Sequence, residues 1–263
     1  MLKKLLKYEF KSIGKWYFAL NAGIIAIAAL LSISIKWFHL ESETNNATYV
    51  IFNQILPFTL ILIFGALVAG SLLATLLIII NRFNQNIYGR EGYLTMTLPV
   101  SEHKIILTKL ISSMICGFFN ALVLVVATAI LVIPQISSSD LERFVNITFP
   151  FINKNWEVAS LFITSYILSS IAGILVIYLS ISLGQLSNNR RRLKAFMYYF
   201  AITIIVSTAV TFINFKLLNI GPKDTTYLLG IRYYLIICVE TLLEIILFYF
   251  ITFGIMKNKL NLQ

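Results

Sequence analysis

Several motifs that catalytic proteins depend on are missing from this chain of 263 residues. No phosphate-binding loop of the form G-x-x-x-x-G-K-S/T occurs, so the chain cannot bind ATP in the Walker manner and would need a partner for any ATP-driven step. The two histidines, His39 and His103, fall in different connections between apolar segments, which leaves no paired-histidine metal site. Clustered Ser, His and Asp candidates are absent as well, so the sequence argues against an enzyme.

Charged residues are also scarce. They make up 12% of the chain, whereas 59% of the residues are hydrophobic and the mean hydropathy is +0.85. A soluble domain is usually about half apolar even when glycine is counted. The two cysteines, Cys116 and Cys238, fall within apolar segments, where a buried thiol is expected rather than a disulfide. This composition predicts an integral membrane protein.

Six apolar runs are long enough to cross a hydrocarbon core of about 30 Å, which takes about 20 helical residues. They extend approximately over residues 17–35, 57–80, 105–133, 158–186, 195–215 and 233–256. The first run is too long for the apolar part of a signal peptide, so we expect it to remain as a span. The connections on the outer side are too short to fold a domain with its own core. We therefore expect an all-α polytopic membrane protein with six transmembrane helices and a single domain over residues 1–263.

Lysine and arginine are distributed unevenly between the connections. Fifteen of them fall in the N-terminal segment, the second-to-third connection with its flanks, the fourth-to-fifth connection and the C-terminal tail, against six on the opposite side. Cytoplasmic segments of membrane proteins carry the excess of positive charge, so both termini are expected in the cytoplasm. The net charge of +10 is then explained largely by topology and by contact with anionic lipids, and a nucleic-acid partner is not expected.

The N-terminal segment 1–16 has a basic face and an apolar face. Residues of both kinds recur at helical spacing: Leu2, Leu5, Leu6, Phe10, Ile13 and Trp16 against Lys3, Lys7, Lys11 and Lys15. This pattern predicts an amphipathic helix that lies in the cytoplasmic interface before the first span. A basic flank that only sets the topology is the alternative interpretation.

The cytoplasmic connection between the second and third spans, residues 88–104, combines glycines with a short apolar strip. Gly89 and Gly92 interrupt the helix, and Pro99 ends the short helical turn that follows them. That turn carries four apolar residues: Tyr93, Leu94, Met96 and Leu98. We expect a short helix held crosswise beneath the membrane, because a loop that only connected two spans would not need an apolar face.

Within this connection, the segment REGYLTMTLPVSEHKIILTKL, residues 90–110, resembles the cytoplasmic signature of ABC-2 type transporter permeases. In that family a basic residue, Glu-Gly, a hydrophobic strip, Pro-Val-Ser and a downstream Lys recur between the second and third spans. The predicted six-span layout and the N-terminal amphipathic helix agree with the family's architecture. Glu102 departs from the pattern, because family members often carry a basic residue after the serine.

The resemblance implies a permease subunit of an exporter in the bacterial cytoplasmic membrane. It implies a second permease subunit, identical or related, and a dimer of cytosolic ATPase subunits that binds ATP and Mg²⁺, so this chain would hold no cofactor, no metal and no catalytic residue. In the family this loop forms the coupling helix that contacts the ATPase. The resemblance assigns that contact here to Arg90, Glu91, Gly92, Tyr93, Leu94, Met96, Leu98 and Pro99.

The substrate is expected to be amphipathic. Small permeases of this kind in low-GC Gram-positive bacteria often export antimicrobial or cytolytic peptides, or protect against them, and the Ile, Asn and Lys bias of the sequence fits such a source. Two other classes of function stay open. An ion-coupled secondary carrier would tend to show internal repeats and spans broken by Gly or Pro, which are not evident. The other is a non-transporting membrane partner that senses or anchors another protein.

Glu240 and Glu244 are the only carboxylates within the six predicted spans. They are one helical turn apart and therefore share a face of the sixth span. An acidic charge that faces lipid at mid-bilayer costs about 2.5–3.5 kcal/mol on insertion scales, so the pair should face protein or water. Three roles stay open: a site in the translocation pathway for a cationic part of the substrate, a structural pair at the subunit interface, or exposure at the membrane interface.

The charge distribution generates a test of topology. Reporters fused after Gln263 or within residues 187–194 should report the cytoplasm, and a reporter within residues 137–140 should report the outside, because the Lys and Arg bias sets the orientation. Paired alkaline phosphatase and green fluorescent protein fusions measure this directly. A C-terminus outside the cell would contradict both the six-span arrangement and the cytoplasmic position of the 88–104 connection.

Overall fold

The computed structural model describes residues 6–7, 9, 14–40, 47–89, 92, 101–187, 189–217 and 230–258. Within these ranges the chain is largely helical and contains no strand. Six stretches are long and apolar enough to cross a membrane: Lys15–Lys36, Phe58–Tyr88, Glu102–Gln135, Trp156–Gln185, Arg191–Lys216 and Ile231–Asn258. Each predicted apolar run falls within one of these stretches, to within one residue at either end. The prediction of six apolar helices long enough to span a membrane is confirmed, as expected of a multi-pass membrane protein.

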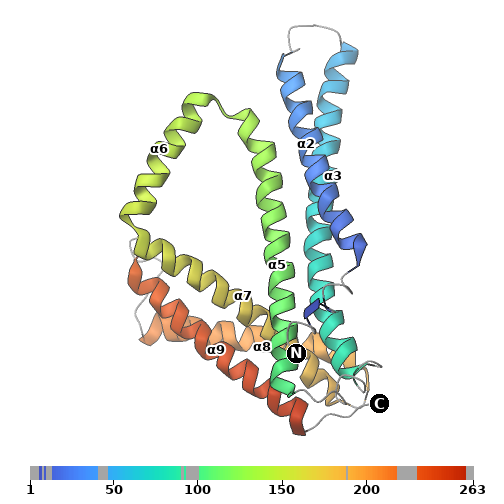
Figure 1. Ribbon diagram of the computed structural model, residues 1–263, viewed down its shortest axis with the longest axis vertical. Coiled ribbons are helices and arrows are strands. Elements are labelled where there is room, and N and C mark those ends of the chain that lie inside the picture. Colours follow the sequence, from blue (N-terminus) through green and yellow to red (C-terminus); the bar gives the residue numbers. More distant parts are fainter. Residues whose placement is uncertain are drawn as a thin grey trace. The chain divides into compact units, whose positions relative to one another are not determined.

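Figure 1 shows the helices in order along the chain. The α-helices are α2 (Lys15–Leu40), α3 (Ala47–Phe83), α5 (Glu102–Val132), α6 (Ser138–Lys154), α7 (Trp156–Gln185), α8 (Arg191–Phe212) and α9 (Ile231–Asn258). Three short segments continue α-helices with other hydrogen-bond patterns: the π-helices η1 (Asn84–Tyr88) and η3 (Ile213–Leu217), and the 3₁₀ turn η2 (Ile133–Gln135). Most helices are apolar around their whole circumference, as membrane spans are.

The chain divides into two compact units. One, called the α7–α9 unit below, consists mainly of Ile79–Met114 and Phe151–Gln263. The other, called the α2 unit, consists of Lys3–Ile78 and Ile115–Pro150. Helices α3 and α5 are each divided between the two units, α3 after Ile78 and α5 after Met114.

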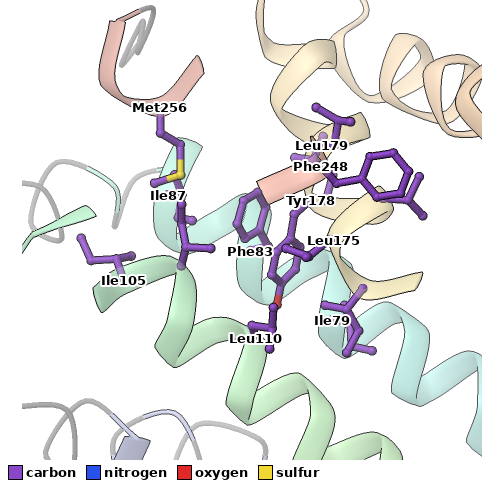
Figure 2. Packing of buried hydrophobic residues seen from close by; sticks show 14 of the residues in the cluster. Ile79, Phe83, Ile87, Ile105, Leu110, Leu175, Tyr178, Leu179, Phe248 and Met256 are labelled. Atoms are coloured by element: carbon purple, nitrogen blue, oxygen red, sulfur yellow. The ribbon is translucent and has the colours of Figure 1, made fainter. Parts of the chain in front are cut away.

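In the α7–α9 unit, α7 packs against both α8 and α9, and α7 and α9 lie side by side (Figure 1). Figure 2 shows the buried cluster of this unit, in which the end of α3 and the start of α5 meet α7 and α9. Phe83, Leu175 and Tyr178 are almost completely buried there. Helix α8 is described throughout and buries none of its residues, so most of its surface is available to lipid or to another chain.

The α2 unit is joined by polar contacts between its three long helices. The hydroxyl of Tyr17 on α2 makes a hydrogen bond of 3.0 Å with Thr75 Oγ1 on α3 and donates to the carbonyl of Cys116 on α5 at 3.2 Å. One turn further along, Asn120 Nδ2 donates to Asn21 Oδ1 at 3.2 Å. The thiols of Cys116 and Cys238 are both buried, as the sequence predicted.

Helix α6 is an element that the search for apolar runs did not predict. It begins after Ser137, whose Oγ accepts a hydrogen bond from the Asp140 backbone N–H at 3.2 Å and so caps the helix. All of α6 is described and none of its 17 residues is buried; large apolar side chains such as Phe144 and Ile147 are exposed. Its apolar and polar residues alternate with helical spacing, so it is amphipathic rather than apolar throughout.

Two predicted segments fall largely outside the described residues. Of the segment 1–16, only residues 6, 7, 9 and 14–16 are described. Of the connection 88–104, only residues 88, 89, 92 and 101–104 are described. The interfacial helix and the coupling helix therefore stay predictions, as does the cytoplasmic position of the termini.

The turn between α7 and α8 depends on a glycine. A Cβ atom built on Gly184 would lie 2.6 Å from the Cβ of Ala195 and 2.8 Å from the carbonyl oxygen of Arg191. Contacts this short do not occur in folded proteins, so any side chain at position 184 would push α7 and α8 apart.

Gly184→Ala should therefore lower the free energy of unfolding by about 1–3 kcal/mol, the usual cost of overpacking. Thermal unfolding of the purified protein in detergent, followed by tryptophan fluorescence, measures the change. Gly254→Ala on α9 is the matched control, because a Cβ there would meet no atom within 4 Å. It should be neutral or stabilising by about 0.5–1 kcal/mol, since alanine favours helix. Equal melting temperatures of the two variants would contradict the close approach of α7 and α8.

Candidate functional site

The connection 88–104 starts from a π-helix that is fastened to α7. Tyr88, the last residue of η1, is buried, and its hydroxyl donates to Ser182 Oγ at 2.8 Å. At the first residue of η1, Asn84 Oδ1 accepts a hydrogen bond from Gln185 Nε2 at 3.0 Å. Because Ser182 and Gln185 lie in the last turn of α7, the start of the connection is tied to the C-terminal end of that helix.

Aromatic stacking extends this attachment to α5. The rings of Phe83 and Tyr178 lie nearly parallel, with centroids 3.9 Å apart and planes 6° from each other. The Tyr178 hydroxyl makes a hydrogen bond of 2.8 Å with Ser113 Oγ on α5. Figure 2 shows Phe83 and Tyr178 together within the buried cluster. We call Phe83, Tyr88, Ser113, Tyr178 and Ser182 the loop clamp.

The far end of the connection is attached to α9. His103, in the first turn of α5, stacks on Phe253 with ring centroids 3.9 Å apart. Its Nδ1 lies 2.7 Å from the Tyr249 hydroxyl, in a hydrogen bond whose donor depends on the histidine tautomer. Behind His103, Ile105 and Ile106 are buried in the cluster. The connection is therefore attached to α7 at its start and to α9 at its end.

The connection itself is described only in part. Gly89 lies where η1 ends, and a Cβ atom there would be 2.7 Å from the Gln85 carbonyl oxygen, so the turn requires glycine. The backbone N–H of Gly92, which is buried, donates to the Gly89 carbonyl at 2.8 Å. The other residues that the resemblance assigns to an ATPase contact lie outside the described residues: Arg90, Glu91, Tyr93, Leu94, Met96, Leu98 and Pro99.

The two intramembrane carboxylates have different surroundings. Asn214 lies in η3, the π-helix that follows α8, and its Nδ2 donates a hydrogen bond of 3.4 Å to Glu240 Oε2. The other oxygen, Oε1, is buried and has no hydrogen-bond partner among the described residues. Glu244, one turn along α9, instead lines a groove of about 350 Å³ between α7, α8 and α9. The two glutamates therefore have different neighbours, and the role of each stays a prediction.

The groove, called the α7–α8–α9 groove below, is lined by one carboxylate, several hydroxyls and apolar side chains. Its polar residues are Glu244, Ser169, Thr203, Ser207, Thr211 and Thr241. Its apolar wall includes Val176, Val206 and Phe248. Within the part of the chain that the structure describes, no three His, Cys, Asp or Glu residues gather closely enough to hold a metal ion.

Comparisons with protein-family models, with curated proteins and with solved structures find no match to this chain. The loop clamp, the groove and the sequence of the connection are therefore the features of this chain that bear on its function.

Sequence reasoning did not identify the loop clamp or the hydroxyls of the groove. The hydroxyls left a readable signal, because Thr203, Ser207 and Thr211 recur at every fourth position and so share a face of α8. The clamp left none, since Tyr88 and Ser182 are 94 positions apart in the chain and nothing local indicates that they meet.

The clamp generates a test by double-mutant cycle. Tyr88→Phe removes one buried hydrogen bond and should lower the free energy of unfolding by about 1 kcal/mol, since Ser182 Oγ keeps its bond to the Tyr178 carbonyl. Combined with Ser182→Ala, the loss should be less than the sum of the two single losses.

Thermal or denaturant unfolding of the purified variants gives these values. Tyr166→Phe, on an exposed position of α7, is the matched control and should change stability by less than about 0.5 kcal/mol. Strict additivity of Tyr88→Phe and Ser182→Ala would show that the two hydroxyls do not interact.

Proposed function

We propose that this chain is the permease subunit of an ABC-2 type exporter in a bacterial cytoplasmic membrane. The observation that carries the proposal is the motif of residues 90–110, held between two ends that are both fastened to apolar helices. In this proposal the chain has no ATP site and no catalytic residue. A dimer of cytosolic ATPase subunits binds ATP with Mg²⁺ and hydrolyses it.

The loop clamp supports the coupling role. A separate ATPase can transmit its closure to the membrane only through a part of the permease that protrudes from the bilayer and is rigidly joined to the spans. Tyr88 and Phe83 join the start of the connection to α7, and His103 joins its end to α9. The coupling helix over residues 88–104 then acts on α7 and α9 together.

The remaining architecture follows from the same proposal. Both termini lie in the cytoplasm, and the segment 1–16 lies as an amphipathic helix in the cytoplasmic interface. A second permease subunit, identical or related, completes the transporter. Helix α8 offers surface for lipid or for that subunit, because large apolar residues such as Ile204 and Ile205 are exposed.

The transported substrate is an amphipathic molecule, with antimicrobial or cytolytic peptides as the leading class, and alternating access moves it outward. One observation favours an ion-coupled carrier instead: Glu244 lies midway along α9 in a groove with hydroxyls, an arrangement that also suits a cation. Copurification of an ATPase distinguishes the exporter from the ion-coupled carrier, since only the exporter requires an ATPase partner.

The proposal is tested at the predicted contact. Tyr93→Ala combined with Leu94→Ala should leave the protein inserted but weaken its binding to the ATPase by about 30-fold or more, since losing such anchors costs about 2 kcal/mol. Quantitative copurification of the ATPase and substrate-stimulated ATP hydrolysis are the measurements.

A matched control removes two apolar side chains elsewhere. Phe144→Ala with Ile147→Ala, both exposed on α6, should copurify with the ATPase as the unaltered protein does. If the Tyr93 and Leu94 variant also copurifies and transports normally, the connection is only a link between two spans.

A further inference from the structure

The α7–α8–α9 groove places a carboxylate opposite hydroxyls at mid-helix. Glu244 lies midway along α9 and Ser169 midway along α7, so the groove falls within the apolar part of the candidate spans. No lysine or arginine is among the described residues that line it. An acidic side chain at this depth is costly and is kept where it meets protein, water or a ligand.

Two hydroxyls of the groove donate hydrogen bonds within their own helices. Thr203 Oγ1 donates to the Tyr199 carbonyl at 2.7 Å, and Thr241 Oγ1 donates to the Ile237 carbonyl at 2.8 Å. The protons of these two hydroxyls are thus used within their own helices, and lone pairs of the two oxygens remain available. With the carboxylate of Glu244, these oxygens form a set of acceptors that suits a group rich in donors and positive in charge.

The rest of the lining is apolar and the space is small. Val176, Val206 and Phe248 offer a surface to hydrocarbon. The volume of about 350 Å³ is near the lower end of ligand sites, which run from about 300 to 1,000 Å³. The groove therefore has room for one charged group and a short alkyl segment, and is too small for a folded peptide.

We infer that the groove binds the primary ammonium group of a cationic amphiphile, with Glu244 and the groove hydroxyls as acceptors and the attached alkyl segment against Val206 and Phe248. A lysine side chain of an amphipathic peptide and a long-chain amine share this chemistry. Glu240 is left out of the site, because it bonds to Asn214 and does not line the groove. As a substrate site the assignment rests on the proposed export function, whereas binding can be measured on this chain alone.

Photolabelling tests the site. The full chain, in phosphatidylcholine nanodiscs without ATPase, is irradiated with a decylamine that carries a diazirine on its alkyl chain, and labelled positions are mapped by mass spectrometry. Label should fall on groove residues of α7, α8 and α9. Excess decylamine should compete it away at concentrations at which decanol has no effect, because only the amine carries the ammonium group.

Substitutions then assign the contact. Glu244→Gln should weaken labelling by about tenfold or more, as expected when a charge-assisted hydrogen bond is lost. Glu157→Gln, which removes an equal charge from an exposed position in the first turn of α7, should leave it unchanged. Unchanged labelling in Glu244→Gln, or equal competition by decanol, would overturn the inference.

A second variant keeps the test decisive if Glu244→Gln fails to fold. Thr203→Val with Ser207→Ala removes hydroxyl acceptors and keeps the carboxylate, and should weaken labelling several-fold. Thr208→Val is its control, since Thr208 lies on α8 outside the groove lining. If the Thr203 and Ser207 variant labels as strongly as the control, the groove hydroxyls are not ligands and the site is wrong.

Two further arms separate the possible sources of the ammonium group and the two proposals. Suppression of labelling by phosphatidylethanolamine in the nanodisc would identify a lipid head group as the occupant and would overturn the substrate assignment. Competition by a lysine-containing amphipathic peptide, with no effect of that lipid, would support it. If no ATPase copurifies with the chain but the groove is labelled, the exporter proposal is refuted and the binding site stands. If an ATPase copurifies but the groove is not labelled, only the binding site is refuted.

Discussion

The packing of the α7–α9 unit depends on the stack of Phe83 on Tyr178, two side chains that are almost completely buried. In hydrocarbon there is no hydrophobic driving force between helices, so close packing and polar contacts have to decide which helices pair. The helices of this unit are apolar all round, and apolarity alone would allow many pairings. The stack joins α3 to α7, and the Tyr178 hydroxyl extends the contact to Ser113 on α5. The Tyr88 bond and the His103 stack then fix both ends of the connection against this core.

Helix α7 is shared by the two features that bear on function. Its C-terminal turns carry Tyr178 and Ser182, which hold the start of the 88–104 connection, and its middle carries Ser169 and Val176, which line the groove. A shift of α7 driven at one end would therefore alter the groove without any further moving part. Rigid secondary-structure elements are one means by which two sites are coupled, and here both features lie on a single continuous helix.

The parts of this structure that the sequence could predict are those with a local cause. Six apolar runs were found because length and hydropathy are local properties, and each run corresponds to a helix. Helix α6 was missed because its signal is a period rather than a run, with polar residues such as Asn146 between apolar ones. The neighbours of Glu240 and Glu244 could not be predicted, because the two residues share a face of α9. Their surroundings differ because η3 passes beside Glu240, whereas α7 and α8 form a groove beside Glu244. Neither could the Tyr88 bond to Ser182, which exists only once distant segments have packed.

The burial of both native thiols has a practical consequence for work on this protein. Thiol reagents modify exposed thiolates, and neither Cys116 nor Cys238 is accessible to them in the folded state. A cysteine introduced at an exposed position would therefore be the first site to react with a maleimide, against a native background that stays silent. Spectroscopic probes can be attached one at a time without first removing Cys116, whose side chain packs with Tyr17 and Ala74 in the α2 unit.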